Sequence, residues 1–265
     1  MYANQYSIII VTYNSSDCIL DLLHDINSLD EGALSRTVIV DNNSSDECVS
    51  AVQTNYPQVQ ILVNKVNIGY GSAVNQAVGF IDTRLFFLLN PDIRLPENFF
   101  SNLMMCVQST DFGAAGPLQF KLKGKTRYLN FCWSFLKLES FKLYLQKRTQ
   151  PKKSFCNLIP VTFLNAGCLL FNKSAYIQVG GFDERYFLYG EEPDIFLKFK
   201  LHGYKCYLHS GVEIIHLRDK SINKLPLIEY IKVRSRAVIN IVDALLRGYS
   251  RFLTKTIATK YKLNL

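Results

Sequence analysis

The sequence predicts an α/β fold built on a mostly parallel β-sheet that is covered by helices. In the first 120 residues, short runs rich in β-branched residues alternate with segments whose apolar residues recur at helical spacing. The expected strands are apolar throughout, as in a parallel sheet buried on both faces. The chain has 265 residues, of which 48% are hydrophobic and 20% charged. This composition is typical of a globular domain and excludes a disordered chain.

The expected elements of the first half follow one another in a regular order. A strand over Tyr6–Thr12 leads into a helix that Ser16 or Asp17 caps. One face of this helix carries Ile19, Leu22, Leu23 and Ile26. The next elements are a strand over Thr37–Val40, a helix over Ser45–Tyr56, a strand over Val59–Val63, a helix over Ser72–Ile81 and a strand over Leu85–Leu89.

The second half departs from this alternation. A segment from about Gln119 to Lys153 is rich in Lys and aromatic residues, and a further apolar run, Gly167–Phe171, predicts another strand and then a short helix. Pro193 suits a first helical turn and predicts a helix over Pro193–His202. Two short strands are expected near Lys205–Leu208 and Val212–His216. We therefore expect one domain over residues 1–221, with halves of about 1–118 and 119–221, and a tail over 222–265.

Cysteine usage indicates a reducing compartment. The seven cysteines are scattered and have no CxxC spacing, so neither a structural zinc site nor a disulfide framework is expected. The N-terminal residues lack the layout of a signal peptide, and no apolar stretch approaches the roughly 20 residues that span a bilayer. These features predict a cytoplasmic protein.

The positive charge is concentrated in the tail. The chain has a net charge of +8, and residues 221–265 contain nine Lys or Arg against two Asp or Glu, a net of +7. An apolar stripe runs along the tail (Val238, Val242, Leu245, Tyr249, Phe252), and a polar stripe runs beside it (Arg236, Asn240, Asp243, Arg247, Arg251). This pattern predicts a basic amphipathic helix. It either lies on an anionic membrane or packs on its own domain. No nucleic-acid-binding motif accompanies the basic tail.

Four strand ends carry small polar or acidic residues. The first strand ends in Thr12, Tyr13 and Asn14, and the second is followed by Asp41 and Asn43. The third leads into a glycine-containing turn with Asn67, Gly69, Gly71 and Asn75, and the fourth ends in Asn90 and Asp92. Because the carboxyl ends of parallel strands meet at one sheet edge, we expect a nucleotide site there. At any single strand, these residue types equally suit a simple turn.

Three further positions favour specific chemistry. Asp92, after a buried strand and a Pro-fixed turn, suits a hard divalent cation that neutralises a diphosphate. Glu191, Glu192 and Asp194 are close enough in sequence to raise one pKa among them, which improves a general base, although acidic residues also favour a helix N-terminus. His216 follows an apolar run and either completes a metal site or fills a structural role.

Seven motifs occur in the order SIIIVTYNS, VIVDNNSSD, NxGxGxxxN, LLNPD, AGCLLF, GGFDERYFLYGEEPD and HLRDKS. Together they resemble the inverting family 2 glycosyltransferases with the GT-A, Rossmann-like fold, and the LNPD form resembles the rhamnosyltransferase-like subgroup. The resemblance covers about Tyr6 to Ser221. It implies a nucleoside-diphosphate sugar donor of the UDP or dTDP type, with dTDP-L-rhamnose favoured by the subgroup. It also implies a Mg²⁺ or Mn²⁺ cofactor and a saccharide acceptor, polyprenyl-linked, at the cytoplasmic face of the inner membrane.

The resemblance also implies roles for individual residues. Thr12, Tyr13, Asn14, Asp41 and Asn43 would surround the base, and Asn67, Gly69, Gly71, Asn75 and Asn90 would lie along the nucleotide and donor sugar. Asp92 would be the main metal ligand and His216 a further ligand to metal or diphosphate. Ala166, Gly167, Asp183 and Asp194 would lie on the acceptor side. Glu192 aligns with the catalytic base.

Two departures from the family pattern leave alternatives. The base position holds Glu where Asp is usual, so Glu191 remains a second candidate, and Asn90 lacks the charge of the first Asp in Asp-x-Asp. A sugar nucleotidyltransferase would need a glycine-rich, basic loop after the first strand, which Tyr13–Ser16 does not provide. A non-catalytic sugar-nucleotide-binding protein would not need Asp92 together with the Glu191–Asp194 cluster.

Overall fold

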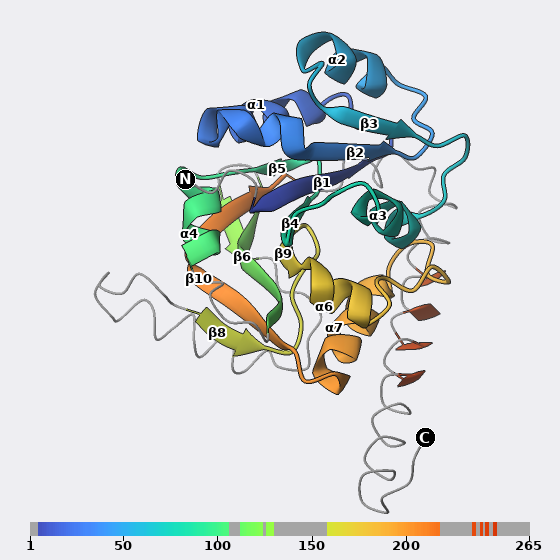
Figure 1. Ribbon diagram of the computed structural model, residues 1–265, viewed down its shortest axis with the longest axis vertical. Helices are drawn as coiled ribbons and strands as arrows, with labels where there is room; N and C mark the ends of the chain where they lie inside the picture. Colours follow the sequence, from blue (N-terminus) through green and yellow to red (C-terminus); the bar gives the residue numbers. More distant parts are fainter. Residues whose placement is uncertain are drawn as a thin grey trace, which may run out of the picture.

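The computed structural model describes residues 5–105, 112–123, 126–129 and 158–217, and residues 235–236, 239–240, 242–243 and 246–247 of the tail. Most of the Lys- and aromatic-rich segment, from residue 130 to 153, lies outside the described residues. Figure 1 shows the helices and strands of the two halves of the domain, one on each side of this segment in the sequence.

The first half alternates strands and helices as expected. Its elements are β1 (Tyr6–Thr12), α1 (Ile19–Leu29), the 3-10 helix η1 (Glu31–Arg36), β2 (Thr37–Asp41), α2 (Cys48–Asn55), β3 (Gln60–Val63), α3 (Tyr70–Val78) and β4 (Leu85–Leu89). The second half is richer in strands. Its elements are β5 (Ile93–Arg94), α4 (Phe99–Met105), β6 (Phe112–Lys123), β7 (Thr126–Leu129), β8 (Leu158–Val161), β9 (Cys168–Asn172), α6 (Lys173–Gln178), α7 (Glu191–Leu201) and β10 (Lys205–His216).

All ten strands join one mixed sheet. The order along its main path is β3-β2-β1-β4-β9-β6-β10-β5, with β7 pairing to β6 and β8 to β10. Strands β1 to β4 are mutually parallel, which confirms the expectation for the first half. Strand β9 runs antiparallel to both β4 and β6, so the second half of the sheet is mixed.

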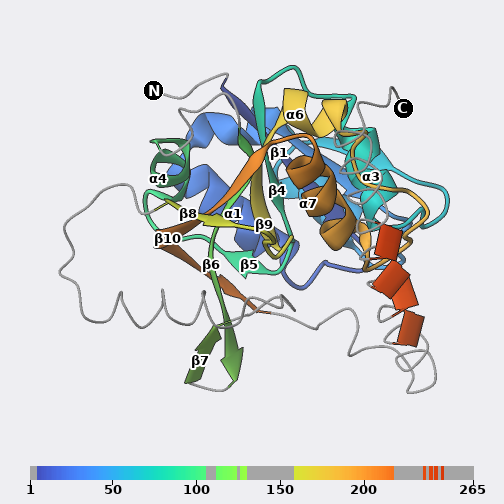
Figure 2. The same cartoon turned by 90° about the horizontal axis from the view of Figure 1, so that it is seen from below.

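Helices cover both faces of the sheet, as Figures 1 and 2 show. Alternate residues of β1 enter two separate cores: Ile8 and Ile10 pack with α1, α2 and α4, while Ile9 and Val11 pack with α3, α6 and α7. The four residues expected on the buried face of α1 are all fully buried. Period-two alternation within an apolar strand thus fills two layers at once.

Several boundary predictions are wrong: α2 begins at Cys48 and not at Ser45, and α3 spans Tyr70–Val78 and not Ser72–Ile81. Two others have a local reason. Neither Ser16 nor Asp17 caps α1, because both lie in a turn held by Ser15 and the N-cap is Cys18. Helix α7 begins at Glu191 and not at Pro193, since the left-handed Gly190 (φ 110°) starts it and Pro is tolerated anywhere in a first turn.

The two strands expected near the end of the domain are one strand, β10. Its ladder with β6 steps from His209 opposite Pro117 to Glu213 opposite Leu118. Extra residues of β10 therefore bulge beside a proline that has no N–H to offer the ladder. No helix within the described residues is long and apolar enough to cross a membrane.

Candidate active site

One pocket of about 250 Å³ opens at the carboxyl ends of β1, β2 and β4. The loops before α3, β9 and α7 and the end of β10 complete its wall. It is lined by eleven of the residues singled out from the sequence: Thr12, Tyr13, Asn67, Gly69, Asn90, Asp92, Ala166, Gly167, Glu191, Glu192 and His216. Because parallel strands place their carboxyl ends at one edge, residues up to 200 positions apart in sequence converge there.

The corner after β1 and β2 is built around Asp41. This buried carboxylate accepts hydrogen bonds from Thr12 Oγ1 (2.9 Å), Ser44 N (2.8 Å) and Ser44 Oγ (2.5 Å), and it does not line the pocket. Asn14, in a left-handed conformation, binds Ser45 N through Oδ1. Asp41 and Asn14 thus support this corner from outside the pocket lining. Tyr13 lines the pocket and is 44% exposed.

The loop before α3 approaches the opposite wall closely. Asn67 Oδ1 accepts a hydrogen bond from Gly69 N, and Tyr70 N donates to Phe187 O at 3.0 Å. Gly69 has φ 87°, and a Cβ on it would lie 2.6 Å from Phe187 O. Only glycine fits this contact, so Gly69 both turns the chain and lets the two walls meet.

Asp92 and His216 meet at the end of β4. His216 Nε2 lies 3.1 Å from Asp92 Oδ1 and 3.3 Å from Asn90 Nδ2. Carboxylate and imidazole groups are suitable ligands for Mg²⁺ or Mn²⁺, and such ions commonly take one or two protein ligands together with substrate phosphates. Among the described residues, no three His, Cys, Asp or Glu side chains form a preformed metal cluster. The two side chains therefore fit a cation that a diphosphate helps to hold, and not an ion held by protein alone.

Glu191 and Glu192 line the same pocket in different surroundings. Glu192 is half-buried, and its Oε1 accepts a hydrogen bond from Ala166 N at 3.0 Å. Glu191 is 3% exposed, and its Oε2 has no hydrogen-bond partner within the described part of the chain. Burial, with the charge of Glu192 next, raises the pKa of Glu191 to about 8. Glu191 is thus the uncharged member of the pair at neutral pH.

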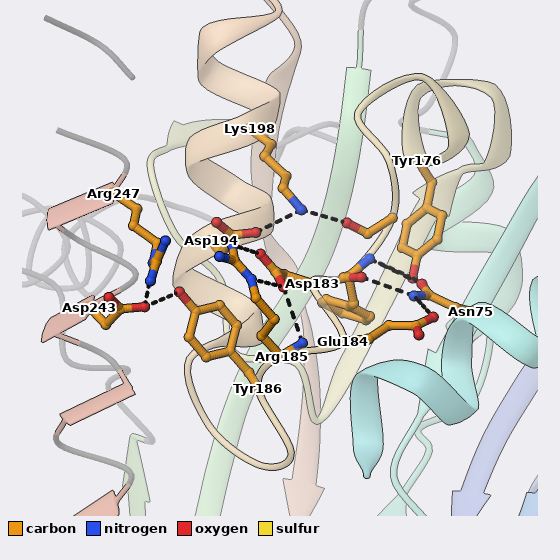
Figure 3. Close-up of polar contacts among 12 residues, drawn as sticks. Asn75, Tyr176, Asp183, Glu184, Arg185, Tyr186, Asp194, Lys198, Asp243 and Arg247 are labelled. Carbon is orange, nitrogen blue, oxygen red and sulfur yellow. Dashed lines mark hydrogen bonds and ion pairs between the residues drawn. The ribbon is translucent and has the colours of Figure 1, made fainter. Parts of the chain in front are cut away.

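Besides Asp41 and Asn14, five further sequence-predicted residues lie outside the pocket lining. Asn43 is exposed and left-handed, and Gly71 packs against Phe182, whose Cβ lies 3.1 Å from the position of a Cβ on Gly71. Asp183 pairs with Arg185, and buried Asp194 pairs with Lys198 at 2.7 Å (Figure 3).

Asn75 connects α3 to the chain after α6. Its Nδ2 donates to Phe182 O (2.9 Å) and Glu184 Oε1 (3.0 Å), and its Oδ1 accepts from Tyr176 Oη (2.6 Å) and Phe182 N (3.1 Å), as Figure 3 shows in part. All its amide hydrogen-bonding capacity is therefore directed at the protein, and it holds the segment that leads to Glu191.

The family model for "Glycosyl transferase family 2" matches residues 7–180, about two thirds of the chain. The chain belongs to glycosyltransferase family 2. It is a nucleotide-sugar-dependent glycosyltransferase.

Two curated relatives of this glycosyltransferase carry rhamnosyltransferase names. The chain is 27% identical over 248 residues to an N-acetylglucosaminyl-diphospho-decaprenol L-rhamnosyltransferase of Mycobacterium tuberculosis, covering 83% of this chain and 78% of that one. It is 26% identical over 220 residues to rhamnosyltransferase WbbL of Escherichia coli, covering 79% and 82%.

A solved structure shows the same fold. GalNAc-T7 with UDP, GalNAc and Mn²⁺ matches with a TM-score of 0.67 at 15% identity, over 82% of this chain and 44% of that one. The likeness thus concerns less than half of the solved protein and establishes the GT-A-like architecture of this glycosyltransferase.

Sequence reasoning missed several residues that line the glycosyltransferase pocket. Asn42, Tyr70 and Phe187–Tyr189 lie within motifs but were not singled out, and Asn165 directly precedes the AGCLLF motif. Tyr189 has φ 63°, an uncommon conformation for a non-glycine residue that marks a tight turn before Glu191. No residue pattern in the sequence signals this backbone angle.

Proposed function

We propose that the chain is an inverting transferase that moves L-rhamnose from dTDP-L-rhamnose to a hydroxyl of a polyprenyl-linked saccharide of a growing surface polysaccharide. One observation carries the reaction type: Asp92 and His216 line the same pocket as Glu191 and Glu192. The names of the two curated relatives support the sugar, and the decaprenol in one of those names supports a lipid-linked acceptor.

The donor half of the pocket suits a nucleotide. Tyr13 offers an exposed ring to a pyrimidine base, and Thr12 stands beside it at the end of β1. Asn67 and Gly69 line the pocket beside this corner and would lie along the phosphates and the sugar. Asp41, behind Thr12, contributes by holding this corner.

The metal ligands would be Asp92 and His216. A divalent cation bound there would supply positive charge to the diphosphate as it leaves, usually the largest electrostatic contribution in such reactions. Ser15 and Asn90 also line this end of the pocket, so the phosphates would find neutral donors beside the cation.

Glu192 would be the general base. It is the less buried of the two glutamates, and the backbone N–H of Ala166 fixes one of its oxygens. Its carboxylate takes the acceptor's hydroxyl proton. The acceptor oxygen then bonds to the anomeric carbon from the face opposite the diphosphate, which departs with the electron pair of the broken C–O bond. Protonated Glu191 keeps a second negative charge away from Glu192.

Ligand binding and transfer test this proposal together. The full chain is screened by thermal shift with dTDP-L-rhamnose, UDP-GlcNAc and UDP-glucose, each with Mn²⁺, because a bound ligand raises the midpoint by mass action. The preferred donor is then assayed with a polyprenyl-diphosphate-linked GlcNAc acceptor, and NMR identifies the anomeric configuration of the product. We expect dTDP-L-rhamnose to give the largest shift and an inverted product.

Other results would replace parts of the proposal. A larger shift with a UDP-hexose, followed by transfer of that sugar, assigns another hexose donor. Retention of configuration contradicts the inverting mechanism. Donor binding without transfer to any acceptor would favour a non-catalytic sugar-nucleotide-binding protein.

We also propose that the tail lies on an anionic membrane, at the cytoplasmic face of the inner membrane. Its described residues separate into two faces. Asn240 Nδ2 donates to Leu188 O at 3.2 Å, and Asp243 accepts from Tyr186 Oη at 2.9 Å, so the polar side contacts the domain. Ile239, Val242 and Leu246 are 67%, 49% and 63% exposed. Val238, Leu245, Tyr249, Phe252 and Arg251 of the expected stripes lie outside the described residues.

A further inference from the structure

His216, at the end of β10, has one ring nitrogen in the pocket and the other in the core. Nε2 lies beside Asp92 and Asn90, whereas Nδ1 has no partner among the described residues although His216 is only 2% exposed. Gln119 Oε1, on the neighbouring strand β6, is also buried and has no hydrogen-bond partner. Orphaned buried polar atoms are uncommon, so two of them close together call for an explanation.

Gly167 shows that the two atoms are neighbours. A Cβ on this residue would lie 2.7 Å from His216 Nδ1 and 2.8 Å from Gln119 Oε1. Both atoms therefore border the small space that the missing side chain leaves. The amide of Gln119 is oriented by the chain around it: Nε2 donates to Asn165 O at 2.7 Å and approaches Cys168 O at 3.4 Å. Its oxygen is thus on the side that faces the imidazole.

A second, independent chain of hydrogen bonds reaches the other ring nitrogen. Tyr70 Oη donates to Asn90 Oδ1 at 3.3 Å, which leaves the NH₂ group of Asn90 directed at His216 Nε2. An NH₂ group can only donate, so Nε2 must accept and the proton of a neutral ring must sit on Nδ1. The groups on the two sides of the ring therefore indicate the same tautomer, with the proton on Nδ1.

We propose that Gln119 is a positioning residue that accepts a hydrogen bond from Nδ1–H of His216 and, with Asn90, keeps Nε2 unprotonated beside Asp92. This inference rests on the proposed function, because it concerns the same site. In this tautomer a lone pair and a carboxylate oxygen face each other at 3.1 Å with no proton between them. That arrangement is unfavourable unless a cation lies nearby. Gln119 thereby prepares His216 as a ligand before the cation arrives.

The tautomer of His216 is the direct test. In the full-length chain, free of metal, long-range ¹H–¹⁵N NMR at a fixed, mildly alkaline pH identifies which nitrogen of each imidazole carries the proton. The His216 signal is assigned by its loss in His216→Ala. We expect the Nδ1–H form in the natural chain. The Nε2–H form would overturn the proposal, whatever the donor or the reaction is.

Two substitutions of Gln119 separate positioning from packing. Gln119→Met keeps the length but removes the acceptor, and Gln119→Glu keeps the acceptor while losing the donation to Asn165 and Cys168. We expect Gln119→Met to lose the Nδ1–H preference and to bind Mn²⁺ about 10- to 100-fold more weakly, as removal of a partner behind a ligand typically does. Gln119→Glu should retain both properties.

Electron paramagnetic resonance of free Mn²⁺, titrated into each variant in the presence of saturating dTDP, measures the affinity, with Asp92→Ala as the control that removes a ligand. Equal Mn²⁺ affinity of Gln119→Met and the natural chain contradicts the proposal, and so does a Gln119→Glu variant as weak as Gln119→Met. An Nδ1–H tautomer without any Mn²⁺ binding leaves the positioning role intact and removes the metal from the proposed function.

Discussion

Glu191 and Glu192 are adjacent in sequence, but α7 places them in different environments. Glu191 enters the core beside α3, where the position of a Cβ on Gly71 is 3.7 Å from Glu191 Cβ. Glu192 remains half-buried with an oxygen bound to Ala166 N. Desolvation favours the neutral form of a carboxyl group, and the nearby charge of Glu192 adds to this effect. One glutamate can therefore stay ionised only if its neighbour keeps its proton.

We predict that Glu192→Gln lowers kcat by about 10² to 10⁴, because the nearly isosteric amide cannot take the acceptor's proton. The donor dissociation constant should change little, since Glu192 serves the acceptor. Turnover at saturating acceptor and donor affinity by calorimetry measure the two effects. Glu191→Gln, the matched control, should be milder. A dead Glu191→Gln with intact donor binding, beside a near-normal Glu192→Gln, would identify Glu191 as the base.

We predict that Glu191→Gln stabilises the protein increasingly as pH rises. The folded state raises the pKa of Glu191 to about 8, so the native chain binds this proton more tightly than the unfolded chain. The resulting stability is complete below the unfolded pKa of about 4.3 and is lost as pH rises through about 8. A glutamine has no proton to lose. The Tm of the variant minus that of the natural chain should grow from pH 5 to pH 8.5.

The control for this measurement is Glu31→Gln, at an exposed position in η1. Its Tm difference should stay near zero across the same range. A constant or falling difference for Glu191→Gln would show that Glu191 is ionised in the folded state at neutral pH.

At the scale of elements, the pocket depends on how α3 meets the segment between α6 and α7. Asn75 hydrogen-bonds the backbone N–H and C=O of Phe182 in this segment. At the N-terminal end of α3, Gly69 leaves room for the carbonyl of Phe187. Aromatic packing of Phe182 against Tyr176 and Tyr70 fills the space between these contacts. The residues that build this contact thus hold the segment that leads to Glu191 and Glu192.

We predict that Asn75→Ala destabilises the fold by about 2 kcal/mol or more, because the carbonyl of Phe182 loses its Asn75 donor and the hydroxyl of Tyr176 loses its Asn75 acceptor. For a chain of this size that corresponds to a fall in Tm of roughly 4–8 °C. Asn55→Ala removes a local contact on the exposed face of α2 and should change Tm by less than about 2 °C. An unchanged Tm together with a large loss of donor affinity would instead place Asn75 against the donor.

At the scale of the whole molecule, the net positive charge and a set of exposed apolar side chains both belong to the tail. The domain carries nearly balanced charge, while residues 221–265 carry a net of +7. The described tail residues contact the Tyr186–Gly190 loop through Asn240 and Asp243 and leave three apolar side chains exposed. A membrane held against that apolar face would lie near the loop that lines the pocket, where a lipid-linked acceptor would enter.

We predict that the full chain sediments with vesicles containing anionic lipid and much less with neutral vesicles. High salt should weaken the binding, since it screens the surface charges. Replacing Ile239, Val242 and Leu246 by Ser should release the protein while donor-induced thermal shift persists. Equal binding to both kinds of vesicle, or none, contradicts the membrane proposal; loss of folding in the triple variant would be visible by circular dichroism.

The motifs that end a strand placed much of the site from the sequence alone. Thr12, Asn90 and Asp92 could be placed from sequence, since a buried strand followed by polar residues has a defined position at the edge of a parallel sheet. Asn75 and Asp194 belong to two other motifs, NxGxGxxxN and GGFDERYFLYGEEPD, but lie outside the pocket. Their spacing gives no information about the direction of their side chains, which the packing of α3 and α7 determines.

The amino-acid sequence by itself determined the alternating strands and helices of the first half, the two-faced burial of β1 and β4, and the convergence of polar strand ends, because these follow from local periodicity. It did not determine the antiparallel insertion of β9, the bulge in β10, or the turn at Tyr189 and Gly190. These depend on contacts between residues far apart in the chain. The unequal burial of Glu191 and Glu192 also depends on such contacts, because adjacent carboxyl groups acquire different pKa values only when packing removes water from one of them. The same holds for the proposed hydrogen bond between Gln119 and His216, whose partners come from different strands.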